Sequence, residues 1–274
     1  DVASYDTTCP FVEKVWKRSA QIGKKDYTIV VHGKRYHEET RATISHAKQS
    51  APVVVVRDLE EAAVLAEFVT GHRAADTFAD CFPDRYSAGF LPERDLRRIG
   101  VVNQTTMLAT ETQEITALLR DAVIRRFGAD NLSDHFADTS DTLCYATNEN
   151  QDATKALIEA GADVAVVVGG YNSSNTSHLV ELAEQRMPTY FVSGADDLES
   201  PALIRHFDYP AREHRQTTDW YPREAPVTVL LTAGASCPDM LIDQVIRKIA
   251  GWHADASSVE TALEPLLALH TPVA

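Results

Sequence analysis

Short runs of apolar residues, rich in valine, alternate along this chain with segments whose apolar residues recur at helical spacing. Such runs are typical of strands that are buried on both faces, as they are in parallel sheets. A chain that alternates strands with helices folds into parallel sheets joined by right-handed crossovers. The pattern therefore predicts an α/β fold. The predicted strands are residues 27–31, 53–56, 99–102, 164–168, 189–192 and 227–231.

Amphipathic helices are predicted between these strands, and two of them have clear start residues. Asp58 precedes one helix and Pro238-Asp239 precedes another, and these residue types favour a first helical turn. Residues 72–98 break the alternation with two prolines and a glycine, which predicts an insertion loop. The predicted helices are residues 59–70, 111–127, 151–160, 176–185 and 240–250.

A domain boundary is predicted near residues 138–141, where the chain passes from one series of strands and helices to the next. The predicted domains are residues 1–139 and 140–274, and the tail from about residue 251 is expected to add one peripheral helix over 257–269. The chain has no initiator Met and begins shortly before a cysteine-containing turn. This start predicts a fragment of a longer protein.

The composition limits the classes of partner. With 274 residues, 44% of them hydrophobic, the chain can form one large or two medium domains. A net charge of −14 argues against binding to nucleic acid or to anionic membranes, but not against a small anionic ligand. No apolar run approaches the roughly 20 residues of a membrane helix, and the first residues lack a signal-peptide pattern. A cytoplasmic protein is predicted, or a stromal one in a plastid-bearing source.

The sequence Asp-Thr-x-Cys occurs twice, ending at Cys9 and at Cys144, each time just before a predicted helix. The two cysteines are too far apart for a zinc knuckle or a Cys-x-x-Cys pair, so a shared site must be assembled from two units. Thiolates from separate loops favour an iron–sulfur cluster, and three thiolates would leave one iron open. Cys237 is the only plausible internal third ligand. The alternative is that both cysteines are buried structural thiols.

Polar residues follow four of the predicted strands, where ligands of parallel sheets bind. Hydroxyl, amide and backbone N–H groups at helix N-termini can hold an anion such as a diphosphate. For each loop taken alone, helix capping is the better explanation of these residues. The run of four polar residues at 172–175 exceeds what one cap requires. The candidate residues are His37, Glu39, Thr105, Ser173, Ser174, Asn175 and Ser236.

His37 and Glu39 stand two residues apart after a predicted strand, so both can line one cavity. A carboxyl group in a closed pocket has a raised pKa and can donate a proton, with a nearby histidine as a relay or an anion contact. The alternative is that Glu38, Glu39 and Arg41 form the solvated first turn of the next helix, and it is the better explanation of these residues taken alone.

Six motifs in the same order resemble the 4-hydroxy-3-methylbut-2-enyl diphosphate reductase family, which catalyses the last step of the methylerythritol phosphate pathway of isoprenoid synthesis. The version resembled is the longer one of plants and cyanobacteria, and the match runs from about residue 6 to 251. The motifs are Asp6-Thr-Thr-Cys-Pro, His37-Glu-Glu-Thr, Asn103-Gln-Thr-Thr-Met-Leu, the Cys144 segment, Asn172-Ser-Ser-Asn-Thr-Ser-His-Leu and Thr232-Ala-Gly-Ala-Ser-x-Pro-Asp.

The resemblance implies a trefoil of three small α/β domains around a central 4Fe–4S cluster, with one cysteine ligand from each domain. Cys9 and Cys144 match two of these ligands. The third ligand belongs to an N-terminal domain of the family that has no counterpart in this sequence. The expectation is therefore that the chain carries two of the three domains.

The resemblance also implies roles for the candidate residues. His37 matches a histidine that contacts diphosphate and relays protons, and Glu39 matches the acid that protonates the substrate. Thr105 matches a threonine near the substrate hydroxyl, while Ser173, Ser174, Asn175 and Ser236 match the diphosphate-binding residues. The implied electron donor is ferredoxin or flavodoxin, and the products are isopentenyl and dimethylallyl diphosphate. Two alternatives stay open: a phosphate-ligand-binding or isomerase-type protein without a cluster, and an inactive fragment of the reductase.

Overall fold

The chain forms two compact units, Asp1–Asn148 and Glu149–Ala274. The computed structural model describes residues 7–137, 139, 144–224, 226–254, 256–262 and 264. The division between the units lies inside a helix, α8 (Tyr145–Ala160), and thus later in the chain than the predicted boundary. Residues 263 and 265–269 of the predicted tail helix lie outside the described part of the chain.

The first unit is built on a four-stranded sheet in which every neighbouring pair of strands is parallel. Its elements are α1 (Pro10–Gly23), β1 (Thr28–His32), α2 (Glu38–Ala47), β2 (Val53–Val56), α3 (Leu59–Thr70), η1 (Ala75–Thr77), α4 (Phe78–Cys81), α5 (Pro92–Asp95), β3 (Ile99–Asn103), α6 (Ala109–Phe127), η2 (Ala129–Asn131), α7 (Leu132–His135) and β4 (Phe136–Ala137). The strand order is β2-β1-β3-β4. The predicted parallel α/β fold is confirmed.

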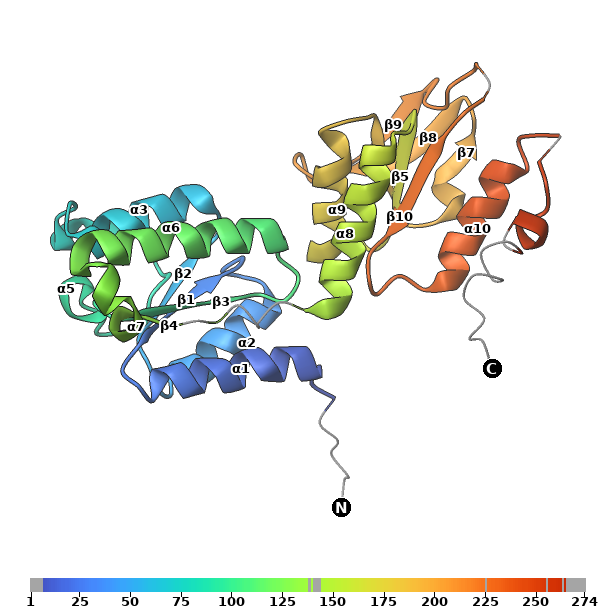
Figure 1. The fold of residues 1–274 in the computed structure, drawn as a ribbon. Helices are drawn as coiled ribbons and strands as arrows, with labels where there is room; N and C mark the ends of the chain where they lie inside the picture. The colour runs from blue at the N-terminus through green and yellow to red at the C-terminus, as the bar shows by residue number, and fades with distance from the viewer. Residues whose placement is uncertain are drawn as a thin grey trace. The chain divides into compact units, whose positions relative to one another are not determined.

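Both faces of this sheet are covered, each by its own pair of helices, as Figure 1 shows. Successive strand residues point to opposite faces. Val30 and Val54 therefore join the apolar core beneath α3 and α6, whereas Ile29 and Val31 join the core beneath α1 and α2. Burial on both sides explains why the strands are continuous apolar runs in the sequence.

Local sequence sets the ends of α3, which were predicted correctly. The Asp58 side chain accepts a hydrogen bond of 2.9 Å from the Glu61 backbone N–H and so caps the first turn. Gly71 then ends the helix in the left-handed conformation, with φ of 78°, which a glycine adopts without the steric cost of a Cβ atom.

Residues 72–98 were predicted to be an insertion loop, and this prediction was wrong. The segment contains the short helices η1, α4 and α5. Phe78, Phe82 and Phe90 are buried and pack with the core of α3 and α6, with the Phe78 and Phe90 rings stacked at a centroid distance of 5.0 Å. These aromatic residues have no regular spacing in the sequence, so periodicity did not detect them.

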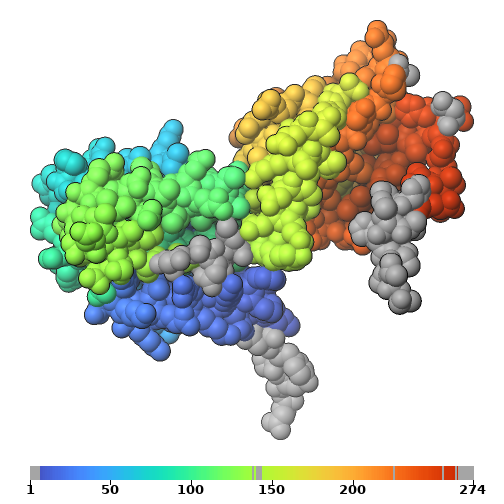
Figure 2. All heavy atoms as spheres, viewed as in Figure 1, coloured from blue at the N-terminus to red at the C-terminus, as the bar shows by residue number. Residues whose placement is uncertain are grey.

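The second unit contains two sheets. Its elements are α8, β5 (Val164–Val168), α9 (Ser174–Glu184), β6 (Thr189–Val192), η4 (Ala195–Asp197), β7 (Leu198–Ser200), β8 (Leu203–Asp208), β9 (Glu213–Thr218), β10 (Val229–Ala233) and α10 (Asp239–Ala250). The parallel sheet has the strand order β10-β5-β6. Helix α8 lies on the molecular surface that Figure 2 shows. The antiparallel sheet β7-β8-β9 was not predicted.

Several predicted boundaries shift by a few residues. β1 and β10 begin and end later than predicted, because pairing starts at Thr28↔Ile99 and at Val229↔Val164. α6, α8, α9 and α10 begin earlier than predicted. None of the described helices is long and apolar enough to cross a membrane.

We expect Leu65→Ala to lower the free energy of unfolding of the first unit by about 2–5 kcal/mol. Leu65 is fully buried in the core of α3 and α6, and the truncation leaves a cavity there. Leu59→Ala in the same helix is the control, because Leu59 is 39% exposed and its truncation should cost less than about 1 kcal/mol. Urea denaturation followed by circular dichroism measures both changes. Equal losses from the two variants would contradict this account of the core.

Candidate functional site

In the first unit, a buried carboxyl group meets a threonine from a neighbouring loop. Glu39 follows β1, and Thr105 follows β3, the strand paired with β1. The Thr105 backbone N–H donates to Glu39 Oε1 at 2.5 Å, and the Thr105 hydroxyl donates to Oε2 at 2.9 Å. Two residues that lie 66 positions apart in the sequence thus form one contact at the carboxyl edge of the sheet.

The environment of Glu39 favours a protonated carboxyl group. Burial raises the pKa of Glu39, and the two hydrogen bonds from Thr105 partly oppose this by stabilising the carboxylate. Because the effect of burial is larger, Glu39 holds its proton to a higher pH than an exposed glutamate does. It is therefore suited to donate a proton inside a closed site.

His37 caps α2, and its surroundings favour the neutral form of its imidazole ring. Its Nδ1 atom accepts a hydrogen bond of 3.3 Å from the Glu39 backbone N–H. Burial lowers the pKa of His37, the Lys34 ammonium group lowers it further, and Glu38 opposes both effects. A neutral imidazole that accepts at Nδ1 carries its proton on Nε2. That N–H is available to a ligand as a neutral donor.

Gln104 joins the loop after β3 to the segment after β1. It was not among the predicted site residues. Its Oε1 atom accepts hydrogen bonds from the Thr40 hydroxyl at 2.9 Å and from the Lys34 backbone N–H at 3.1 Å. Its Nε2 atom donates to the Thr106 hydroxyl at 2.6 Å. The side chain is fully buried. Its place between Asn103 and Thr105 in a polar strand-end motif was the available sequence signal.

In the second unit, the first turn of α9 buries polar atoms that make no hydrogen bond within the described part of the chain. They are the Ser174 hydroxyl, both polar side-chain atoms of Asn175, and the Thr176 hydroxyl. The Ser173 hydroxyl caps the helix by accepting from the Thr176 backbone N–H at 3.3 Å. Leaving several buried polar groups unpaired is costly. Together with the positive end of the helix dipole, they form a binding site suited to an anion.

The loop after β10 lies against this helix start. A Cβ atom on Gly234 would collide with the Thr176 hydroxyl and would lie 3.7 Å from the Ser173 hydroxyl. Only a glycine permits this close approach. Ser236 lies two residues further along the same loop and is exposed. The predicted residues Ser173, Ser174, Asn175 and Ser236 thus come from two loops that touch each other.

Cys9 and Cys144 occupy matching local structures. Each cysteine directly precedes a helix, and its carbonyl oxygen accepts the first helical hydrogen bond, from Glu13 at 3.1 Å and from Asn148 at 2.9 Å. Cys9 is exposed and Cys144 is buried. The Asp and Thr residues before Cys144 lie outside the described part of the chain. No three His, Cys, Asp or Glu residues among those described are grouped so that they could hold a metal ion.

Cys237 is poorly suited to act as a third thiolate. Its Sγ atom is directed to the Pro238 carbonyl oxygen at 3.8 Å, and the side chain packs against the core of the second unit. Burial raises the pKa of the Cys237 thiol, and the nearby Asp239 carboxylate raises it further. Both effects favour the protonated thiol, which is a weaker metal ligand than a thiolate.

The chain is an α/β protein with parallel sheets. At their carboxyl edges lie a buried carboxyl group with a raised pKa in one unit and buried polar atoms, unpaired among the described residues, in the other, and this edge is where ligands of such sheets bind. The family model described as "LytB protein" matches residues 1–250. The chain therefore belongs to the LytB family.

Two similar proteins are named 4-hydroxy-3-methylbut-2-enyl diphosphate reductase. The one from Gloeobacter violaceus is 44% identical over 245 residues, which cover 89% of this chain and 58% of that protein. The one from Picosynechococcus is 42% identical over 255 residues, which cover 93% of this chain and 62% of that protein. The chain thus spans about three fifths of the length of these relatives.

A solved structure of the E-1-hydroxy-2-methyl-but-2-enyl-4-diphosphate reductase from Plasmodium falciparum has a similar fold, with a TM-score of 0.55 and 18% sequence identity. The match covers 96% of this chain and 70% of that one. At this identity, the similarity supports the fold.

We expect Glu39→Gln to stabilise the first unit increasingly as the pH rises. A raised pKa means that the folded state binds the Glu39 proton more tightly than the unfolded state does. This contribution to stability is complete below the pKa of the unfolded chain and is lost as the pH rises through the higher folded pKa. Glutamine stays neutral and can keep both contacts with Thr105. Urea denaturation of the variant and the wild type between pH 4 and pH 8 measures the effect.

Glu38→Gln is the matched control, because the Glu38 side chain is 88% exposed. Its unfolding should show the same pH dependence as that of the wild type. A Glu39→Gln curve that runs parallel to the wild-type curve over the whole range would show that Glu39 is not protonated preferentially in the folded state.

Proposed function

We propose that this chain takes part in the reductive dehydroxylation of 4-hydroxy-3-methylbut-2-enyl diphosphate to isopentenyl and dimethylallyl diphosphate. The observation that carries the proposal is the buried Glu39 carboxyl group, which has a raised pKa and is bound at both oxygens by Thr105. The names of the similar cyanobacterial proteins support this choice of substrate.

The proposed reaction needs protons and electrons in a dry site. The carbon–oxygen bond of the substrate breaks, and the hydroxyl group takes up one proton and leaves as water. The carbon skeleton takes up two electrons and a second proton at carbon. We infer that a reduced ferredoxin or flavodoxin supplies the electrons. A buried carboxyl group whose pKa is raised, as that of Glu39 is, is the type of acid that this step requires.

Glu39, Thr105 and His37 share the proton chemistry in this proposal. Glu39 holds the proton that is delivered to the substrate. Thr105 orients the carboxyl group and can turn its hydroxyl toward the hydroxyl of the substrate. His37 offers a neutral Nε2–H group to the diphosphate. Because its lowered pKa favours the neutral imidazole, His37 stabilises the Glu39 carboxylate less than a charged histidine would.

The anion site of the second unit would hold the diphosphate. The hydroxyl groups of Ser173, Ser174 and Ser236 and the side-chain amide of Asn175 are the donors that we assign to it. Their support is the set of unpaired buried atoms at the start of α9 and the close contact with the loop after β10. A diphosphate accepts several hydrogen bonds at once and would satisfy these groups.

Two thiol groups of the chain fit a 4Fe–4S cluster by their chemistry. Cys9 and Cys144 would supply thiolate ligands, since each lies at the positive end of a helix, where a thiolate is stabilised. Such a cluster supplies electron transfer and a Lewis-acidic iron. Cys237, directed to a carbonyl oxygen, is not included.

We expect anaerobic reconstitution with iron and sulfide to give a coloured protein. Cys9→Ser and Cys144→Ser should each lose most of the bound iron, because serine is a much poorer iron ligand than a thiolate. Iron and sulfide analysis, together with the visible absorption spectrum, measures this loss. Cys237→Ser is the control and should bind as much iron as the wild type. A colourless wild type without iron would favour a phosphate-binding protein without a cluster, whereas full iron binding by Cys9→Ser would show that Cys9 is not a cluster ligand.

We expect inorganic pyrophosphate to bind to the chain, and Ser174→Ala and Asn175→Ala each to weaken binding about tenfold or more, as the loss of a hydrogen bond to a charged group does. Isothermal titration calorimetry measures the dissociation constants. Ser193→Ala is the matched control, because Ser193 is an exposed loop serine whose hydroxyl group bonds Asp197. Equal affinities for all variants would place the anion elsewhere.

A further inference from the structure

His32, the last residue of β1, is a fully buried histidine to which the site described above assigns no role. In the sheet, its backbone is paired with Val56 on one side and with Asn103 on the other. It therefore lies beside the point where β3 ends and the Thr105 loop begins.

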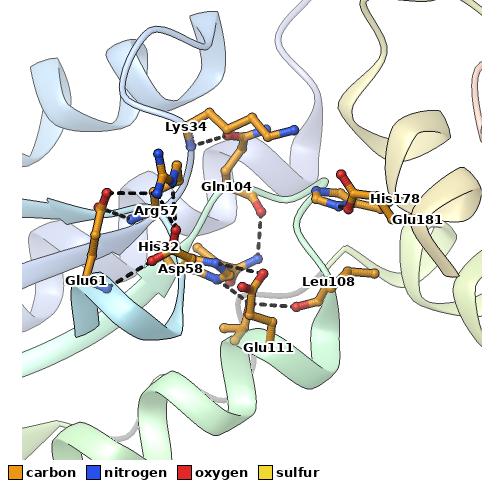
Figure 3. Close-up of polar contacts among 12 residues, drawn as sticks. His32, Lys34, Arg57, Asp58, Glu61, Gln104, Leu108, Glu111, His178 and Glu181 are labelled. Atoms are coloured by element: carbon orange, nitrogen blue, oxygen red, sulfur yellow. Dashed lines mark hydrogen bonds and ion pairs between the residues drawn. The ribbon is translucent and has the colours of Figure 1, made fainter. Parts of the chain in front are cut away.

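Two different parts of His32 hold the two ends of that loop, residues 104–108. At the start of the loop, the His32 carbonyl oxygen accepts a hydrogen bond of 2.8 Å from the Gln104 backbone N–H. At its end, His32 Nδ1 lies 2.8 Å from the Thr112 hydroxyl oxygen. The Thr112 hydroxyl and backbone N–H both contact the Leu108 carbonyl oxygen at 3.0 Å. Figure 3 shows the His32 ring beside Leu108 and Glu111 at the start of α6.

An imidazole ring at this position buries a ring nitrogen without a hydrogen bond among the described residues, which costs free energy of folding. His32 Nε2 makes no hydrogen bond within the described part of the chain, although Glu111 Oε2 lies 3.5 Å away. An apolar ring of similar size would avoid burying an unpaired nitrogen. It would also lack an atom that can bond Thr112. The contact that only the histidine provides is thus the one that anchors the end of the Thr105 loop.

We propose that His32 is a positioning residue that fixes the Thr105 loop at both ends and so holds Thr105 against Glu39. The catalytic meaning of this role rests on the proposed function, whereas the structural role does not. Thr105 lies between the two anchored positions, Gln104 and Leu108. Both donors of Thr105 reach Glu39 only while the loop keeps its present course.

This role has a measurable consequence at Glu39. The hydrogen bonds from Thr105 stabilise the Glu39 carboxylate and oppose the larger effect of burial. Loss of the anchor weakens these bonds and leaves burial in place, so the pKa of Glu39 must rise further. A residue with a purely structural role elsewhere in the fold would not change this value.

The experiment is a carbon-13 NMR titration of the Glu39 carboxyl group in the whole chain, in wild type and variants. We expect His32→Phe to raise the pKa of Glu39 by about half a unit or more. Thr112→Val, which removes the partner of the ring, should give a similar rise. The double variant should show no more than either single change, because both changes break the same link. His32→Gln, which retains a side-chain donor, should restore part of the wild-type value.

The second unit offers a matched control, where His206 Nε2 lies 2.9 Å from the Thr217 hydroxyl oxygen. His206→Phe and Thr217→Val remove the same kind of contact far along the chain and should leave the pKa of Glu39 unchanged. If His32→Phe does not fold, the test is made by comparing Thr112→Val with its control, Thr217→Val. An unchanged Glu39 pKa in folded His32 and Thr112 variants overturns the inference, and so does an equal rise in the control variants.

This titration needs neither cluster nor substrate, so its result is separate from that of the proposed function. A chain that binds neither iron nor pyrophosphate would contradict the reductase proposal, and the role of His32 would still be decided by the Glu39 pKa. Conversely, if the chain is active as a reductase but its Glu39 pKa does not change in the His32 variants, the proposed function stands and the role of His32 is contradicted.

Discussion

The parallel pairing of β1 with β3 is the interaction on which the first unit depends. Its register sets His32 opposite Asn103, so the two strands end at the same level of the sheet. The loops that carry Glu39 and Thr105 therefore begin side by side, and one short contact joins them. A slip of one residue would turn every side chain of the strand to the opposite face. The apolar runs that fill both faces thus also determine where the acid lies.

The second unit repeats this arrangement with different chemistry. Pairing of Ala233 with Val168 brings the ends of β10 and β5 to one level, and the Gly234 backbone N–H continues the ladder to the Val168 carbonyl oxygen at 3.0 Å. The loop after β10 then meets the start of α9, where small residues permit the close approach. In one unit the strand ends present an acid, and in the other they present hydrogen-bond donors.

Much of the fold could be predicted because burial on both faces leaves a continuous apolar run, as at Val53–Val56 and Val164–Val168. The hairpin of β8 and β9 was missed because its strands are largely polar and β9 is mostly exposed. The predicted site residues were recognisable from polar motifs at strand ends. Gln104 stands in such a motif, but its role and that of His32 were not predicted, because they depend on partners 64 and 80 residues away in the sequence. Spacing along the chain contains no information about such contacts.

The proposed anion site at the start of α9 is made of hydroxyl groups, a carboxamide and a helix end. Neutral donors do not attract anions over long distances, and their hydrogen bonds respond less to ionic strength than lysine or arginine contacts do. They act only at contact, where the shape of the ligand must match the positions of the donors. In a chain with a net charge of −14, recognition of the proposed anion would therefore depend on short-range contacts rather than on long-range attraction.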